Sequence, residues 1–118
     1  MKFSENHIWV DSRLSTAGIS DYAQNSLGDI VYIDLPEVGQ VFHKGAQFGS
    51  IESVKSVSPL IAPLQMKVLD VNEILENEPE LINTNPYGKG WMVKIEVMNK
   101  EELGELLPEE DYLAQMEN

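Results

Sequence analysis

The chain has 118 residues, 42% of them hydrophobic, so it is long enough to fold as one domain around one core. It carries 8 basic and 20 acidic residues, and the resulting net charge of −12 argues against binding to nucleic acids or to anionic membranes. The chain contains no cysteine, which excludes disulfides, thiolate nucleophiles and cysteine-based metal sites.

The first part of the chain predicts two short strands and a helix. Residues 7–10 include β-branched and aromatic side chains typical of a strand, and residues 14–19 are a second candidate strand. Ser20 is a favoured N-cap residue, so we expect a helix over residues 21–27. Gly28 follows this segment and is a typical helix stop.

The middle of the chain predicts further strands joined by tight turns. Residues 30–35 are apolar at successive positions, which predicts a strand that is buried on both faces and ends before Pro36. Glycines at positions 39, 45 and 49 then divide the sequence into short segments, as tight corners require. Residues 68–71 are another candidate strand, and residues 72–75 a single helical turn.

A loop and an alternating strand follow. Residues 83–90 have the composition of a loop. Residues 91–97 alternate between apolar and polar side chains, which predicts a strand with one face on the core. The side chains expected on that face are Trp91, Val93, Ile95 and Val97.

The sequence pattern becomes helical over residues 98–118. Asn99 and Glu102 have the spacing of a capping box, and Pro108 suits the first position of a further helix. Two apolar stripes are expected on these helices, one formed by Leu103, Leu106 and Leu107 and the other by Tyr112, Leu113 and Met116. The whole chain is therefore predicted to be one β-rich domain, 1–118, with a helical tail packed on it.

One lysine, Lys55, is placed where a chain can display a side chain. It follows an apolar run, lies among small polar residues and precedes a second strand-like run, with strands expected near residues 48–51 and 59–62. This pattern predicts the tip of a hairpin. A displayed lysine can serve as the attachment point of a mobile cofactor, although a solvated turn lysine has the same local pattern.

Several kinds of enzyme site are absent from the sequence. There is no Gly-x-Ser-x-Gly nucleophile motif, and the lysine within residues 86–90 lacks the other residues of a phosphate-binding loop. His7 and His43 are isolated and lack the spacing of metal ligands. No pair of carboxylates is singled out for acid–base catalysis.

Nearly the whole chain, from about His7 to Tyr112, resembles the H proteins of the glycine cleavage system, a family of lipoyl carriers. Several segments match this family in order, which is more specific than one motif. These segments are Ser20-Asp21-Tyr22-Ala23-Gln24, Leu27-Gly28-Asp29-Ile30-Val31, Leu35-Pro36-Glu37-Val38-Gly39, Glu52-Ser53-Val54-Lys55, Ala62-Pro63, Val71-Asn72 and Asn85-Pro86-Tyr87-Gly88-Lys89-Gly90-Trp91.

The resemblance implies a fold and a modification site. The fold is mainly β, a barrel-sandwich hybrid of the lipoyl/biotinyl-domain type, with short helices and a C-terminal helical tail. The family lysine that carries lipoate in amide linkage corresponds to Lys55, and Glu52, Ser53 and Val54 correspond to the signal read by the lipoate-attaching enzyme. Biotin carriers flank their lysine with methionines, whereas Val54 and Ser56 stand here, which argues against biotin.

The resemblance also implies a function and partners. The chain is expected to be a non-catalytic carrier that shuttles an aminomethyl group on its lipoyl-lysine arm. The partners are glycine decarboxylase (P protein), aminomethyltransferase (T protein), dihydrolipoyl dehydrogenase (L protein) and a lipoate-attaching enzyme. The lack of cysteine suits such a carrier, because a nearby thiol could exchange with the lipoyl disulfide.

Two residues depart from the family pattern. The family reads His-Glu-Trp where this chain has Ile8 between His7 and Trp9, so a carboxylate suited to an aminomethyl ammonium is missing. The family also has a glycine where this chain has Met66, and methionine tolerates positive φ poorly. For Met66 a rearranged turn is the expected outcome.

Two alternative functions remain open at this point. One is a divergent H-like carrier that stores or relays lipoyl groups to other complexes. The other, from a different class, is an unmodified acidic interaction module. The first residues lack the apolar core of a signal peptide and no apolar stretch has the length of a membrane span, so a cytoplasmic bacterial protein is expected, with a mature organelle protein as the alternative. A monomer is expected.

Overall fold

The structure is a computed structural model of the chain, and it describes residues 1–116. The last two residues of the predicted tail lie outside the described part. The strands are β1 (Lys2–Phe3), β2 (Ile8–Asp11), β3 (Thr16–Ile19), β4 (Ile30–Asp34), β5 (Val41–Phe42), β6 (Gln47–Ser53), β7 (Val57–Ile61), β8 (Met66–Val71), β9 (Val93–Val97) and β10 (Leu107–Pro108). The helices are α1 (Asp21–Leu27), the 3-10 helix η1 (Glu73–Glu76), α2 (Leu81–Thr84), α3 (Lys100–Leu103) and α4 (Glu109–Met116).

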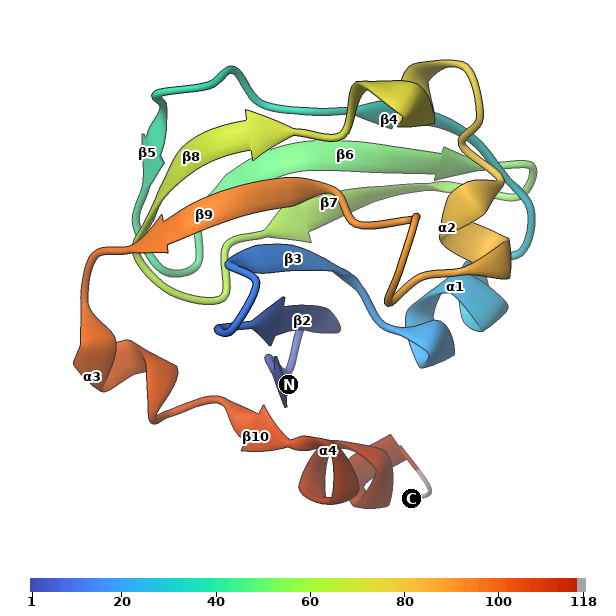
Figure 1. Cartoon of the computed structure of the whole chain (residues 1–118). Helices are drawn as coiled ribbons and strands as arrows, with labels where there is room; N and C mark the ends of the chain where they lie inside the picture. The colour runs from blue at the N-terminus through green and yellow to red at the C-terminus, as the bar shows by residue number, and fades with distance from the viewer. Residues whose placement is uncertain (117–118) are drawn as a thin grey trace.

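The strands of residues 1–116 form two antiparallel sheets. The larger sheet has seven strands in the order β10-β1-β2-β3-β9-β8-β5, and the smaller has three in the order β4-β6-β7. Figure 1 shows the end of the β6–β7 hairpin on the same side of the molecule as α1 and α2, while β10 and α4 lie beside the N-terminal strands. This mainly β architecture, with short helices and a C-terminal helix, confirms the predicted fold class.

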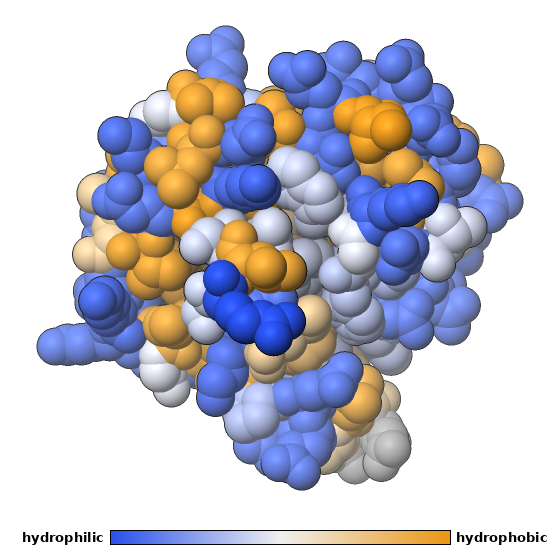
Figure 2. Space-filling model, viewed as in Figure 1, coloured by the Kyte–Doolittle hydropathy of each residue, from blue (hydrophilic) through white to orange (hydrophobic). Residues whose placement is uncertain are grey.

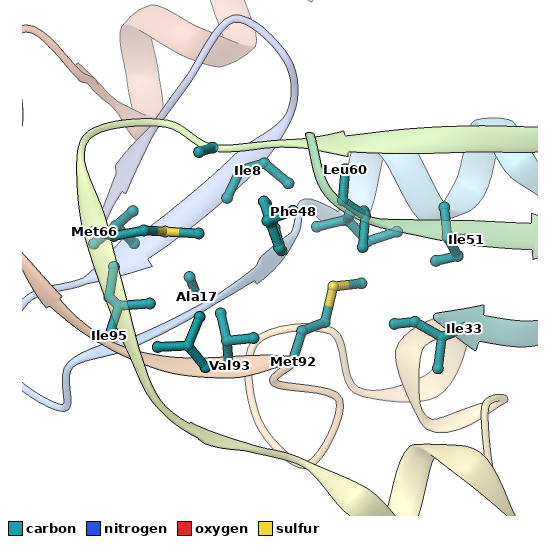
Figure 3. Close-up of a cluster of buried hydrophobic side chains, with 14 of the residues drawn as sticks. Ile8, Ala17, Ile33, Phe48, Ile51, Leu60, Met66, Met92, Val93 and Ile95 are labelled. Atoms are coloured by element: carbon teal, nitrogen blue, oxygen red, sulfur yellow. The ribbon is translucent and has the colours of Figure 1, made fainter. Parts of the chain in front are cut away.

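The main core lies between the two sheets. Ile8 and Ala17 from the larger sheet and Ile51 and Leu60 from the smaller one are all at most 1% exposed. Figure 3 shows such side chains pointing toward one another from strands of both sheets. Apolar residues on the inner faces therefore hold the sheets together, because each sheet can bury only one of its faces against the other.

A second apolar cluster attaches α4 to the outside of the larger sheet. It is built on Phe3, Trp9 and Tyr112, with Tyr87 and Trp91 among the residues packed against it. The rings of Phe3 and Tyr112 stack with their centroids 4.7 Å apart. The two ends of the described chain are thereby packed together.

Local signals predicted α1 correctly. The Ser20 hydroxyl oxygen accepts a hydrogen bond from the Ala23 backbone N–H at 3.1 Å, as expected of an N-cap. Gly28 ends the helix with a φ of 83°, a conformation that favours glycine.

The prediction of a doubly buried strand at residues 30–35 is wrong. Ile30 and Ile33 are buried, but Val31 and Tyr32 are 48% and 57% exposed. The β4–β6 register shifts between Ile30 and Tyr32, so a β-bulge turns two successive apolar side chains outward. Apolar content alone could not reveal this bulge.

The observed ends of several other strands and helices differ from the predicted ones, because tertiary contacts compete with local secondary-structure preferences. The second predicted strand begins at Thr16, after a turn in which Ser15 has a φ of 57°. Residues 83 and 84 belong to α2 instead of a loop. In the alternating segment, β9 begins only at Val93, and Trp91 packs in the second cluster while Met92 is fully buried in the main core.

The tail also differs in detail from its prediction. Asn99 caps α3 by accepting from the Glu101 N–H, but Glu102 does not complete the box and instead accepts from the Gln65 N–H at 2.8 Å. Pro108 lies in β10, directly before α4. Leu113 is 45% exposed, so the apolar side of α4 is narrower than predicted.

Among residues 1–116, no helix combines the length and apolar character needed to cross a membrane. The face shown in Figure 2 is mostly hydrophilic, with separate apolar groups between the polar ones.

Candidate functional site

Lys55 lies in the connection between β6 and β7, and its side chain is exposed. Ser53 organises this turn, because its hydroxyl oxygen accepts from the N–H groups of Lys55 at 3.2 Å and Ser56 at 3.1 Å. The Val54 N–H donates to the Asp29 carbonyl at 3.0 Å and ties the turn to the segment after α1. The expected hairpin tip is therefore present, with a hydrogen-bonded base and an exposed lysine side chain.

The end of the Lys55 side chain rests against the C-terminal end of α1. Its Nζ donates a hydrogen bond to the Ser26 carbonyl at 3.2 Å. An ideal Cβ built on Gly28 would lie 3.1 Å from Lys55 Cε, so glycine leaves room for this side chain. The last turn of α1 has no basic residue, and a cation from elsewhere in the chain is favourable at its free carbonyls.

The residues predicted to be read by the lipoate-attaching enzyme occupy different environments. Glu52 is exposed on the outer face of the smaller sheet, and Val54 is 66% exposed beside Lys55. Ser53 is only 5% exposed, and its hydroxyl is used inside the turn. A partner protein can therefore contact Glu52 and Val54 directly, whereas Ser53 acts on the shape of the hairpin.

A cavity of about 130 Å³ lies next to this position. Ser26, whose carbonyl accepts from Lys55 Nζ, and Leu27 both line it. The cavity is lined by Asn6, His7, Ile8, Ile19, Tyr22, Ala23, Ser26, Leu27, Ile51, Ser58, Pro59 and Leu60. This lining is mainly apolar and contains no carboxylate. A side chain extended from Lys55 thus has an apolar recess beside it.

The two departures from the family pattern have different consequences. Ile8 lines the cavity and is only 1% exposed, so it offers hydrocarbon contact and no charge. Met66 is fully buried in β8, opposite Val97 and Phe42. Among the described non-glycine residues only His7 and Ser15 have positive φ, so Met66 occupies an ordinary strand position and no glycine is needed there.

A hydrogen-bonded chain joins α4 to the wall of the cavity. The Tyr112 hydroxyl lies 2.6 Å from His7 Nδ1 and 2.6 Å from the Ser20 hydroxyl oxygen. Burial lowers the pKa of His7, which favours the neutral imidazole. Burial also raises the pKa of Tyr112, against a smaller opposing effect of its hydrogen bond with Ser20.

Sequence reasoning treated His7 as isolated and missed this chain of contacts. Its members lie 105 and 92 residues apart along the sequence, so no local pattern could have shown them. Among residues 1–116, no group of three or more metal-ligating side chains is placed to hold a metal ion.

A larger cavity, of about 410 Å³, is lined by residues from the N-terminal segment and the tail. The ion pair between Lys44 and Glu105, with a 2.6 Å separation, lies along it. It includes no residue of the β6–β7 turn. Size alone therefore does not identify the functional cavity, and the smaller one beside Lys55 is the better candidate.

Comparisons with known proteins show the family of this chain. The family model described as Glycine cleavage H-protein matches residues 1–118. The glycine cleavage system H protein of Carboxydothermus hydrogenoformans is 52% identical over 114 residues, which cover 95% of this chain and 88% of that protein. The one from Thermotoga maritima is 48% identical over 113 residues, covering 94% and 91%.

A solved structure gives the same result. The crystal structure of a glycine cleavage system H protein from Mycobacterium marinum has a TM-score of 0.89 and 33% identity, and the match covers 99% of this chain and 96% of that one. The chain therefore belongs to the glycine cleavage H-protein family, whose members are non-catalytic lipoyl-carrier subunits.

Proposed function

We propose that the chain carries a lipoyl group in amide linkage to Lys55 and presents it to the enzymes of glycine cleavage. The observation that carries this proposal is the position of Lys55, exposed at the tip of a hydrogen-bonded hairpin and beside an apolar cavity. The resemblance of the relatives to this chain over nearly its full length supports the glycine cleavage role over the alternative of a lipoyl relay.

The residues around Lys55 suit a lipoyl amide. Acylation removes the charge of Nζ but leaves one N–H, and the Ser26 carbonyl 3.2 Å away can still accept from it. The cavity lined by Ile8 and Leu27 offers apolar surface to the hydrocarbon part of the arm. The chain has no cysteine that could exchange with a lipoyl disulfide.

The lipoyl group, when attached, supplies a disulfide ring that accepts an aminomethyl group and is later reoxidised. The protein contributes presentation. Ser53 holds the turn, so the arm swings from a fixed point and its effective concentration at a docked partner is high. The net charge of −12 steers the carrier toward basic surfaces on its partners.

The proposed partners are glycine decarboxylase, aminomethyltransferase, dihydrolipoyl dehydrogenase and a lipoate-attaching enzyme. We further propose a monomer made of one domain, with the tail as part of it. The packing of Tyr112 against Phe3 supports this domain assignment. The relatives reported above are bacterial, which supports a cytoplasmic location.

Peptide mapping tests the attachment site. The purified chain is incubated with a lipoate-attaching enzyme, lipoate and ATP, and each of its seven lysines is examined by mass spectrometry. We expect modification of Lys55 alone. Lys55→Arg, which keeps the charge beside Ser26, should remain unmodified and should unfold at the same urea concentration as the wild type, since exposed surface positions contribute little to stability.

Modification that persists in Lys55→Arg would show that another lysine is the attachment site. A second assay separates the two carrier functions. With glycine decarboxylase, aminomethyltransferase and dihydrolipoyl dehydrogenase, the lipoylated chain should support glycine-dependent reduction of NAD⁺. Full lipoylation without any glycine turnover would instead favour the relay function.

A further inference from the structure

The bulge in β4 creates an exposed apolar surface next to the hairpin. On β4, Ile30 pairs with Ser53 of β6, and both side chains are buried. The next paired residue of β4 is Tyr32, which pairs with Glu52 on the outer face of the smaller sheet. Val31 is the extra residue between them, so it too is turned outward. Bulges of this kind commonly redirect side chains at functional sites.

Three residues form a straight row across the smaller sheet, and we call it the outer row: Tyr32 on β4, Glu52 on β6 and Val57 on β7. Tyr32 lies opposite Glu52, and Glu52 lies opposite Val57. Tyr32 is 57% and Val57 67% exposed, and Glu52 is also exposed. A carboxylate therefore lies between two exposed apolar side chains, at the base of the turn that carries Lys55.

We propose that the outer row is the docking surface for the enzyme that acylates Lys55, an inference that rests on the proposed function. An enzyme that forms a bond to Nζ must bring its donor carbon into contact with Lys55, and it must therefore cover the hairpin. Enzymes that act at the far end of the attached arm have no such requirement. The complementary surface is apolar with a basic side chain at its centre, which pairs with Glu52.

The covalent step in that complex is an acyl transfer without oxidation or reduction. Lys55 Nζ leaves the Ser26 carbonyl, loses a proton and attacks the carbonyl carbon of an acyl-adenylate donor. The new C–N bond forms as the bond from that carbon to the adenylate oxygen breaks. Adenylate leaves with the electron pair, and the nitrogen releases its second proton. The outer row takes no part in this chemistry and only positions Lys55.

A double variant, Tyr32→Ser with Val57→Ser, tests the proposal. Leu69→Ser with Val41→Ser is the matched control, because Leu69 and Val41 are 46% and 47% exposed on the larger sheet and Leu69 also lies at a bulge. Lipoylation kinetics are measured by intact mass with a lipoate-attaching enzyme, lipoate and ATP. We expect kcat/KM to fall about tenfold or more in the outer-row variant, mainly through KM, and to change by less than about twofold in the control.

Two further measurements separate docking from damage to the hairpin. Acetylation of Lys55 by acetic anhydride needs no docking surface, so its rate should be the same in the outer-row variant and the wild type. Raising the salt concentration should increase the KM of the wild type, and this increase should be smaller in Glu52→Gln than in the wild type.

Wild-type lipoylation kinetics in the outer-row variant would overturn the inference and leave the proposed function intact. The same holds if lipoylation is normal and only the later glycine-dependent reactions are slowed, because the row would then dock a different partner. A slower reaction with acetic anhydride would also overturn it, since it would show altered Lys55 reactivity. No modification of the wild-type chain at Lys55 would overturn the proposed function and this inference with it.

Discussion

The substitution Tyr112→Phe isolates one hydroxyl group that links α4 to the wall of the cavity. The hydroxyl lies 2.6 Å from both His7 Nδ1 and the Ser20 hydroxyl oxygen. The phenylalanine ring can keep the stacking against Phe3, where the ring centroids are 4.7 Å apart. The variant therefore removes two hydrogen bonds and leaves the apolar packing of the tail in place.

The two lost hydrogen bonds have unequal costs. Ser20 is fully buried, so water cannot replace the Tyr112 hydroxyl there, although Ser20 still accepts from the Ala23 N–H. His7 is partly exposed and can bond to water instead. One buried polar group is thus left with an unmet hydrogen bond, and we expect the free energy of unfolding to fall by about 1–2 kcal/mol. For a domain of this size that corresponds to a melting temperature lower by about 4–8 °C.

Urea unfolding followed by tryptophan fluorescence measures this change, and Tyr22→Phe is the control. Tyr22 is 43% exposed, so its substitution should change the free energy of unfolding by less than about 0.5 kcal/mol. Lipoylation of Lys55 should be unaffected in both variants. If Tyr112→Phe is as stable as the wild type, or if Tyr22→Phe is equally destabilised, the hydroxyl does not hold the tail and the reasoning fails.

Three further predictions concern the core, the cavity and pH. Val93→Ala should lower the free energy of unfolding by about 1–3 kcal/mol, because Val93 is fully buried. Lys94→Ala should lower it by at most about 1 kcal/mol, the value of the exposed cation–π contact between Lys94 and Trp91. If urea unfolding gives the larger loss for Lys94→Ala, the strand register is wrong. Ile8→Glu should slow spontaneous release of the aminomethyl group from the loaded arm, and the neutral Ile8→Gln should not. The reason is that the cavity lacks a carboxylate and only glutamate can pair with the ammonium. Equal release rates in Ile8→Glu and the wild type would show that the loaded arm does not use this cavity or that another acid already pairs with it. His7 has a pKa below its usual 6.5 in the folded state, so the unfolded chain binds more protons, and the free energy of unfolding should fall as the pH is lowered from about 7.5 to about 5.5. His7→Gln should reduce this pH dependence, and an unchanged dependence in His7→Gln would contradict the argument.

Local sequence signals were sufficient for the elements whose stability depends on nearby residues. The cap at Ser20 and the stop at Gly28 predicted α1, because both act on backbone groups within one helical turn. The small polar residues around Lys55 predicted the hairpin tip for the same reason. The resemblance of several ordered segments to one family predicted the fold class and the carrier function from the sequence alone.

Only the tertiary structure could decide which apolar residues are buried and which distant groups meet. A bulge in β4 turns Val31 and Tyr32 outward, although their sequence is that of a buried strand. The His7–Tyr112–Ser20 contacts join residues about a hundred positions apart, and the Ser26 carbonyl meets Lys55 because α1 packs beside the hairpin. Burial and long-range hydrogen bonds depend on how the sheets and helices pack, and this packing is a property of the whole chain that no short window of sequence contains.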